Sequence, residues 1–309
     1  MQNNFHSNGK LLLTSEFLVI DGAQALALPC QYGQSLSVET LKEPEILWES
    51  YTDEGKRWFE AIFSVQGDQI KHVPYASEFQ DEETAQRLVE IFQVLKEMKP
   101  DLFTKNGYAF KSRLEFPQIW GLGSSSTLLN NLATWAGVDA YELSDRTFGG
   151  SAYDIACAQE SSPLIYQRIS STLPKVDLVD FDPEFKDELF FVHLNQKQNT
   201  REVVQHYKAL NESVKEQWIA QAEQLTNQFL NCKTLTEFEG LMVKHEHLLS
   251  EVLAMKPIKQ LLFPDFTGAV KSLGAWGGDF ALATGGEKEK DHFKEKGYNT
   301  ILSYSEMVL

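Results

Sequence analysis

One stretch of the chain, GLGSSSTLLN at residues 121–130, places glycines and serines directly before an apolar run. A glycine-rich turn that enters a helix leaves backbone N–H groups without partners at the positive end of the helix dipole. Phosphate binds to such groups, and a serine hydroxyl there can cap the helix or bind a phosphate oxygen or a metal. Because the lysine of a P-loop is missing, the stretch predicts either an anion site whose cation lies elsewhere or an ordinary helix start.

Two charged residues could complete such a site. Asp154 lies in GGSAYDIACAQ (149–159), at the start of an apolar helical run. It is either an acid that stabilises the helix dipole or a general base that takes a proton from a hydroxyl nucleophile. Lys10 precedes a leucine-rich strand, where a lysine usually extends along the apolar surface towards solvent. Beside a transferred phosphoryl group, Lys10 would supply the charge that the serine stretch lacks.

A second glycine cluster, KSLGAWGGDF at 271–280, permits close approach of the backbone to a ligand or to another backbone segment. A tight packing turn is the alternative. The segment KHEHLL contains His245 and His247, which face different sides of the predicted helix and cannot share a metal. We therefore expect these histidines to be ordinary core or surface residues.

Hydrophobic patterning predicts the elements that must position these residues. A hairpin is expected around Asp53–Lys56, and helices are expected at 81–99, after the serine stretch to about residue 135, through most of 199–253, and within 285–297. Strands are expected at 10–22 (two short ones around a polar turn), 107–116, 163–169, 188–194 and after the second glycine cluster. Strands and helices mix without regular alternation, which indicates an α+β fold. The polar stretch 170–187 is the best candidate for a domain boundary.

Composition limits the class of protein. The 309 residues suffice for one large domain or two ordinary ones, and the net charge of −16 argues against nucleic acid as the main partner. The three cysteines are far apart, which disfavours a disulfide framework or a structural zinc site. Neither a signal peptide nor an apolar run long enough to cross a membrane is evident. We therefore expect a cytoplasmic protein without a membrane partner, acting as a monomer or a homodimer.

Four segments, in order along nearly the whole chain, resemble the motifs of the GHMP superfamily of small-molecule kinases. They are GKLLLTSEFLVIDGAQALALP (9–29), PQIWGLGSSSTLL (117–129), GGSAYDIA (149–156) and GAVKSLGAWGGDFALA (268–283). The resemblance implies a two-domain GHMP kinase fold. An N-terminal mixed α/β domain, residues 1–175, would bind ATP, and a ferredoxin-like α+β domain would span 176–309.

Within this superfamily the chain is most similar to the mevalonate-pathway kinases. The segment NQKQNTREVV (195–204) resembles their S-T-R-E segment, and Asp279 matches the G-G-D of phosphomevalonate kinases. The resemblance implies ATP-dependent phosphoryl transfer to a small acidic substrate, with a phosphomevalonate kinase-like activity first, mevalonate kinase second and diphosphomevalonate decarboxylase third. A different class is also open: a catalytically inactive binding or regulatory protein on the same fold.

The resemblance also implies roles for individual residues. Lys10 and Asp154 would be catalytic, with ATP and Mg²⁺ as cofactors. Ser125 would hold the metal together with Glu142, for which Asp145 is an alternative and a surface acid is an equally open interpretation. The nucleotide phosphates would bind Gly121, Leu122, Gly123, Ser124, Ser125 and Ser126. The substrate would bind Glu16, Thr200, Arg201, Lys271, Gly274, Ala275 and Trp276.

Some positions depart from the family pattern. Ser15 and Ala152 replace glycines, Phe17 replaces a histidine or tyrosine, and Trp276 stands where a small glycine normally faces the phosphates or the substrate. These departures bear on the identity of the substrate more than on ATP binding.

Overall fold

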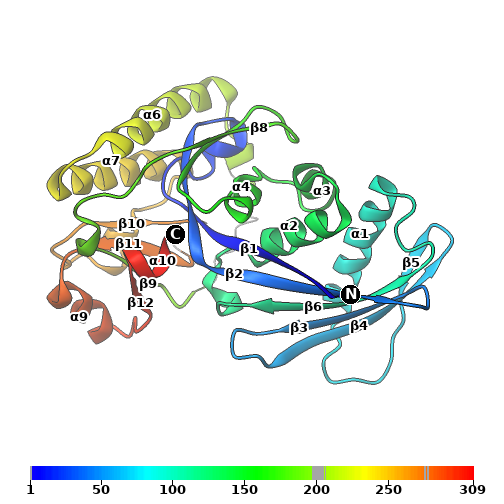
Figure 1. Cartoon of the computed structure of the whole chain (residues 1–309). Coiled ribbons are helices and arrows are strands. Elements are labelled where there is room, and N and C mark those ends of the chain that lie inside the picture. The colour runs from blue at the N-terminus through cyan, green and yellow to red at the C-terminus, as the bar shows by residue number, and fades with distance from the viewer. Residues whose placement is uncertain (1, 197–204, 206, 275, 277) are drawn as a thin grey trace. The chain divides into compact units, whose positions relative to one another are not determined.

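The computed structural model describes residues 2–196, 205, 207–274, 276 and 278–309. Contacts divide the chain into two compact units, each built from separate segments (Figure 1). The first unit contains Met1–Gly9, Tyr32–Gln118 and Leu122–Gln159, and the second contains Lys10–Gln31, Ile119–Gly121 and Glu160–Leu309. Strands β1 (Gln2–Leu12) and β2 (Ala25–Leu41) therefore contribute residues to both units.

In the first unit, a mixed sheet has the strand order β5-β4-β3-β6-β2, and helices pack over one of its faces (Figure 1). Strands β3 and β4 form the hairpin, and β3 also pairs in parallel with β6. Inward-facing side chains of these strands and helices, such as Trp48, Phe92 and Phe110, form one apolar core. The elements are β3 (Glu45–Tyr51), β4 (Arg57–Gln66), β5 (Gln69–His72), β6 (Gly107–Leu114), α1 (Glu82–Met98), α2 (Ser124–Ala136), α3 (Ala140–Thr147) and α4 (Tyr153–Gln159).

The second unit contains a ferredoxin-like arrangement. Its antiparallel sheet has the order β10-β11-β9-β12, and the chain runs from β9 through helices to β10 and β11 and then through a further helix to β12. This is the β-α-β-β-α-β pattern expected from the resemblance. The elements are β9 (Leu189–His193), α6 (Glu212–Asn231), α7 (Leu235–Leu253), α8 (Ile258–Leu262), β10 (Val270–Ser272), β11 (Phe280–Thr284), α9 (Glu287–Glu295), β12 (Ile301–Ser303) and α10 (Tyr304–Met307).

The same unit also holds a hairpin of β7 (Leu164–Arg168) and β8 (Pro174–Leu178), and the first residues of β2 pair with β7. Short 3-10 turns lie at η1 (Leu18–Asp21), η3 (Lys186–Glu188) and, across the segment that enters the glycine–serine stretch, η2 (Gln118–Trp120).

The mixed α+β class, the β3–β4 hairpin and the long helices are confirmed. The second short strand predicted within 10–22 is wrong, because Phe17 at φ 65° and Gly22 at φ 92° bracket a 3-10 turn instead. The stretch 170–187 is less irregular than expected, because it supplies β8. The last passage of the chain from the first unit to the second lies at residues 159/160, and β7 and β8 belong to the second unit.

Among the residues that the structure describes, no helix is both long and apolar enough to cross a membrane.

Candidate functional site

The glycine–serine stretch forms the start of α2, as the sequence predicts. Gly123 is the N-cap in the left-handed conformation, at φ 92°, and no side chain caps the helix. The first intrahelical bond runs from the Thr127 N–H to the Gly123 carbonyl. The N–H groups of the turn before Thr127 therefore lack carbonyl partners within the helix, and they lie at the positive end of its dipole.

The three serines of this stretch differ in burial. Ser125 is exposed, whereas Ser126 is buried and its hydroxyl donates a 2.8 Å hydrogen bond to the Gly123 carbonyl. Ser126 thus closes the first turn of α2, which explains a serine whose side chain has no obvious ligand role. Leu122 is also buried, so the groups of the stretch best placed for an external ligand are backbone N–H groups and the Ser125 hydroxyl.

Gly121 belongs to the second unit and packs against Asp279. A Cβ at position 121 would lie 2.0 Å from the Asp279 Oδ2, and Gly121 has φ 65°, so only glycine fits there. The preceding residues are held in place, since Trp120 stacks edge-on against Phe280 at 5.6 Å and the His193 Nε2 lies 3.2 Å from the Ile119 carbonyl oxygen. A carboxylate thus lies beside the first glycine of the stretch.

Asp154 lies in the first turn of α4, where it is half-buried. The Ile155 N–H donates to its Oδ1 at 3.1 Å. Two residues earlier, Ala152 has φ 62°, and its carbonyl accepts from Ile155 N–H at the start of the helix. The turn that presents Asp154 therefore keeps a glycine-type backbone although glycine is absent.

Lys10 lies within β1, not ahead of a strand, and is half-buried in the second unit. Burial raises the pKa of the Cys30 thiol, and the positive charge of Lys10 opposes that shift. The charge of Lys10 therefore lies close enough to the Cys30 thiol to affect its pKa.

Glu142 is a surface residue of α3. Its backbone N–H donates to the Asp139 N-cap side chain, and its carboxylate lies 3.5 Å from Arg146. No group of three or more histidine, cysteine, aspartate or glutamate side chains that could hold a metal occurs in the described part of the chain. Glu142 is therefore seen as half of an exposed ion pair.

Glu16 and Lys271 form a buried ion pair in the second unit. The Lys271 Nζ donates to Glu16 and, at 2.9 Å, to the Ser272 carbonyl, and the side chains of Glu16 and Lys271 are 1% and 0% exposed. Burial raises the pKa of Glu16 to about 7, although the charge of Lys271 lowers it. Removal from water thus outweighs the attraction of the cation.

His245 lies beside this pair, on α7. The Ser15 N–H donates to its Nε2 at 2.9 Å, so Nε2 is an acceptor and the ring is neutral. Burial, reinforced by Lys271, holds the pKa of His245 well below its ordinary value. Its 3.4 Å contact with the Glu16 Oε2 is therefore not an ion pair.

Glu246, the next residue of α7, holds the second glycine cluster. Its Oε1 accepts from the Ser272 N–H at 3.0 Å and from the Trp276 indole N–H at 2.9 Å, and its Oε2 accepts from the Ile258 N–H at 3.3 Å. Trp276 is 1% exposed and packs with Phe17 in an apolar cluster. The indole is thus inside the unit, not on a surface.

Three positions where the sequence departs from the family's glycines share one backbone property. Ser15 has φ 62°, Ala152 has φ 62° and Trp276 has φ 29°. Each lies in the left-handed region that glycine occupies without strain. The backbone of the three motifs is retained while each of these residues carries steric strain.

The predicted site residues are distributed over both units. The first unit holds Leu122–Ser126, Glu142 and Asp154, and the second holds Lys10, Glu16, Gly121, Lys271, Gly274 and Trp276. Within the second unit, the structure brings Glu16 together with Lys271. Thr200, Arg201 and Ala275 lie outside the described residues.

Sequence reasoning missed two residues of this cluster, His245 and Glu246. The spacing of the histidines in their segment predicts only that the two cannot share a metal. His247 does lie apart from this cluster, where it lines a separate surface hollow with Gln221. A signal was present: a glutamate on the apolar face of a helix has to find buried donors.

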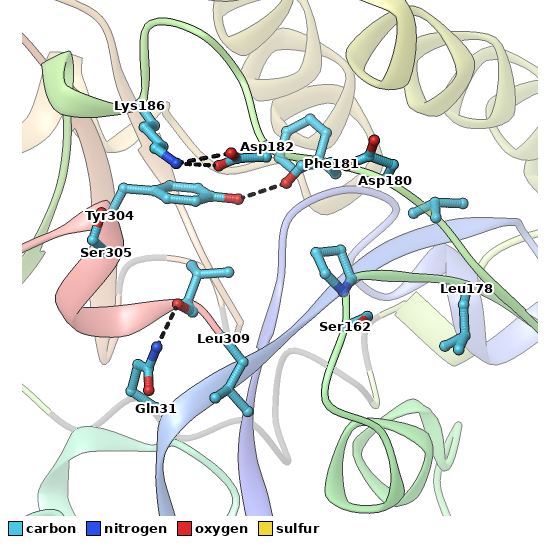
Figure 2. A pocket seen from close by; sticks show the side chains of 13 residues that line it. Gln31, Ser162, Leu178, Asp180, Phe181, Asp182, Lys186, Tyr304, Ser305 and Leu309 are labelled. Atoms are coloured by element: carbon cyan, nitrogen blue, oxygen red, sulfur yellow. Dashed lines mark hydrogen bonds and ion pairs between the residues drawn. The ribbon is translucent and has the colours of Figure 1, made fainter.

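A cavity of about 580 Å³ in the second unit holds none of the predicted site residues (Figure 2). Its polar groups largely pair with one another: Lys186 with Asp182 at 2.7 Å, the Tyr304 hydroxyl with the Phe181 carbonyl at 3.1 Å, and Gln31 with the Val308 carbonyl at 3.1 Å. Figure 2 shows Leu178 and Leu309 along the same cavity.

Comparison with known proteins identifies the fold. No protein-family model and no curated protein sequence matches the chain. Among solved structures, the chain is similar to Methanococcus jannaschii mevalonate kinase, with 17% identity, a TM-score of 0.66 and coverage of 97% of this chain and 96% of the other. It is also similar to Streptococcus pneumoniae phosphomevalonate kinase in complex with phosphomevalonate and AMPPNP, with 13% identity, a TM-score of 0.67 and coverage of 97% and 99%. It is similar as well to Lactococcus lactis galactokinase complexed with galactose, with 12% identity, a TM-score of 0.71 and coverage of 100% of this chain and 93% of the other.

These likenesses extend over nearly the full length of each chain, and with the two sheets described above they show that the protein has the two-domain GHMP kinase fold.

Proposed function

We propose that the protein is an ATP-dependent kinase of a small acidic substrate, with a phosphomevalonate kinase-like activity as the best candidate. One observation carries the proposal most: α2 begins at a left-handed Gly123 with no side-chain cap, which leaves its first N–H groups to an anion. The solved structures with this fold include a phosphomevalonate kinase in complex with phosphomevalonate and AMPPNP. A nucleotide phosphate is the anion that fits this helix start.

In the proposed site, ATP would bind with its phosphates on Gly121–Ser126, mainly through backbone N–H groups. The exposed Ser125 hydroxyl fits a Mg²⁺ ion, which takes hard oxygen ligands and usually shares them with phosphates and water. Glu142 fits less well, because Arg146 already pairs with it. Bound Mg²⁺ would neutralise the charge on the phosphate oxygens.

Phosphoryl transfer requires positioning more than strong bases. The acceptor oxygen of the substrate would attack the γ-phosphorus, and the bond from that phosphorus to the ADP oxygen would break. Asp154 would take the proton of a hydroxyl acceptor or of a singly protonated phosphate acceptor, and Lys10 would stabilise the charge of the reacting oxygens. A half-buried carboxylate at the start of α4 suits this role.

The substrate is the least constrained part of the proposal. Asp279 beside Gly121 supports the phosphomevalonate kinase-like choice, because G-G-D is the pattern of that group. Mevalonate kinase follows, then diphosphomevalonate decarboxylase. A non-catalytic ligand-binding protein is favoured by one observation, the buried Trp276 in place of a glycine, but Lys10 and Asp154 are both retained.

The test is a coupled ADP-release assay with Mg²⁺-ATP over phosphomevalonate, mevalonate, homoserine and sugars, together with CO₂ release from diphosphomevalonate. We expect turnover with phosphomevalonate. ADP release with mevalonate alone would replace the proposed substrate. Silence across the panel, with ATP binding intact by calorimetry, would favour the non-catalytic alternative.

A further inference from the structure

Glu246 connects three segments of the second unit that are distant in sequence. Its two carboxylate oxygens accept from the Ser272 N–H of β10, the indole N–H of Trp276 and the Ile258 N–H at the start of α8. Glu246 is 2% exposed. A buried carboxylate is stable only when donors satisfy it, so the three bonds and the carboxylate depend on one another.

Trp276 needs such an anchor. A tryptophan at φ 29° carries backbone strain of about 1–3 kcal/mol, which persists only where the surroundings hold it. Its ring packs with Leu248, Leu249 and Val252 of α7, and its only polar atom donates to Glu246. The apolar cluster and this one bond together hold the Trp276 backbone in its strained form.

The charged and titratable groups around Glu246 come from three elements. Lys271 of β10 lowers the pKa of Glu246 while burial raises it, and Glu16 and His245 lie against Lys271. Lys271 donates to Glu16 and to the Ser272 carbonyl, and the Glu246 oxygens accept from N–H donors.

We propose that Glu246 is a positioning residue that fixes Ser272 and Trp276 of the second glycine cluster, and that through Trp276 it sets which acceptor the enzyme takes. The second half of this inference rests on the proposed kinase function. Trp276 would then act by holding its backbone in place and not as a ring that stacks on a ligand, because its indole is buried and bonded.

Hydrogen exchange tests the positioning without any substrate. Glu246→Met removes both oxygens, so the Ser272 and Ile258 backbone N–H groups lose their acceptor. We expect exchange at the Ser272 and Ile258 amides to rise at least about tenfold, since a buried donor is costly to leave unpaired. The matched control is Glu239→Met, one heptad earlier on α7, whose carboxylate accepts from Thr284 of β11. Exchange at Ser272 and Ile258 should stay unchanged in the control, and unchanged exchange in Glu246→Met would overturn the positioning role.

Kinetics test the specificity half. Trp276→Phe keeps a ring but removes the indole N–H. We expect each single variant to raise the acceptor KM about tenfold with the ATP KM within about twofold, and the double variant to be no worse than either single one, because both remove the same bond. Additive losses, or equal changes in both KM values, would overturn it.

The two failures are distinguishable. If the native chain turns over no acceptor, the proposed function fails, and the exchange experiment still decides whether Glu246 positions the cluster. If turnover is normal and exchange does not respond, the positioning role fails alone.

Discussion

Two regions of the molecule treat charge in opposite ways. The start of α2 leaves N–H groups without carbonyl partners within the helix, next to the exposed Ser125. The cluster around Glu16 and Lys271 does the reverse, since it buries two opposite charges and bonds them to each other. The first region is ready for an external anion. The second pairs its opposite charges with each other, although the Glu16 Oε2, His245 Nδ1 and Ser272 Oγ atoms are buried without a hydrogen-bond partner among the described residues.

This difference distinguishes groups that bind a ligand from groups that hold the protein's own segments in place. An external ligand gains most where protein groups lack partners, as at a helix start. A buried ion pair instead offers little to a ligand and makes the surrounding segments dependent on one another. In our interpretation the α2 start and Asp154 act on ligands directly, while Glu16, Lys271 and Glu246 hold segments of the second unit together.

Breaking the buried pair should have the largest effect. Lys271→Met leaves an uncompensated carboxylate at Glu16, so at pH 8 we expect the free energy of unfolding to fall by about 3–5 kcal/mol. Urea denaturation measures it. Adding Glu16→Gln should recover most of the loss, and Lys56→Met, which breaks the exposed pair with Glu54, should have no measurable effect. A full-stability Lys271→Met would mean that the pair does not support the fold.

On the other side of the comparison, Asp154→Asn should abolish chemistry and spare binding. We expect kcat to fall by about 10³-fold, the scale of a lost general base, with nucleotide affinity unchanged. Single-turnover kinetics and calorimetry with AMPPNP separate the two. The control is Asp101→Asn, an exposed aspartate of the same unit. Wild-type turnover in Asp154→Asn would remove Asp154 from the base role.

The pH dependence sharpens the comparison, because burial shifts the pKa values of Glu16, His245 and Glu246 in the buried cluster. Since the folded pKa of Glu16 is about 7, the folded chain retains a proton that the unfolded chain loses above its ordinary pKa near 4.5. The contribution of Glu16 to stability is thus fully present below pH 4.5 and is lost as the pH rises to about 7, by about 3 kcal/mol. His245, whose pKa is lowered, opposes this because its contribution is lost as the pH falls below about 6.5.

The difference between the native chain and Glu16→Gln isolates the carboxyl group. The free energy of unfolding of Glu16→Gln minus that of the native chain should rise between pH 4.5 and 7 and then level off. A difference that does not change with pH would show that Glu16 titrates normally.

How much could be read from the sequence differs between the two regions for the same physical reason. The α2 start depends on local spacing, since Gly123 and the serines are neighbours, and so the helix start and the Asp154 turn were predictable. The buried cluster joins Glu16, His245, Glu246 and Lys271 from segments far apart in the chain. No local pattern marks such partners, because each residue meets its neighbours only after the chain has folded.

The smallest expected effect concerns the turn that presents Asp154. Ala152 has φ 62°, which costs an L-residue about 1–2 kcal/mol, while glycine costs about 0.5–1 kcal/mol in lost chain entropy. Ala152→Gly should therefore raise the free energy of unfolding by up to about 1 kcal/mol, measured by urea denaturation. Ala254→Gly, at φ 53° after α7 in the second unit, is the matched control and should gain similarly. If turnover also stays within about twofold in Ala152→Gly, the strain is only a cost of replacing glycine. If kcat falls while stability rises, the strained turn itself helps to orient Asp154. The Asp154 turn would then depend on a strained backbone conformation, as the buried cluster does at Trp276.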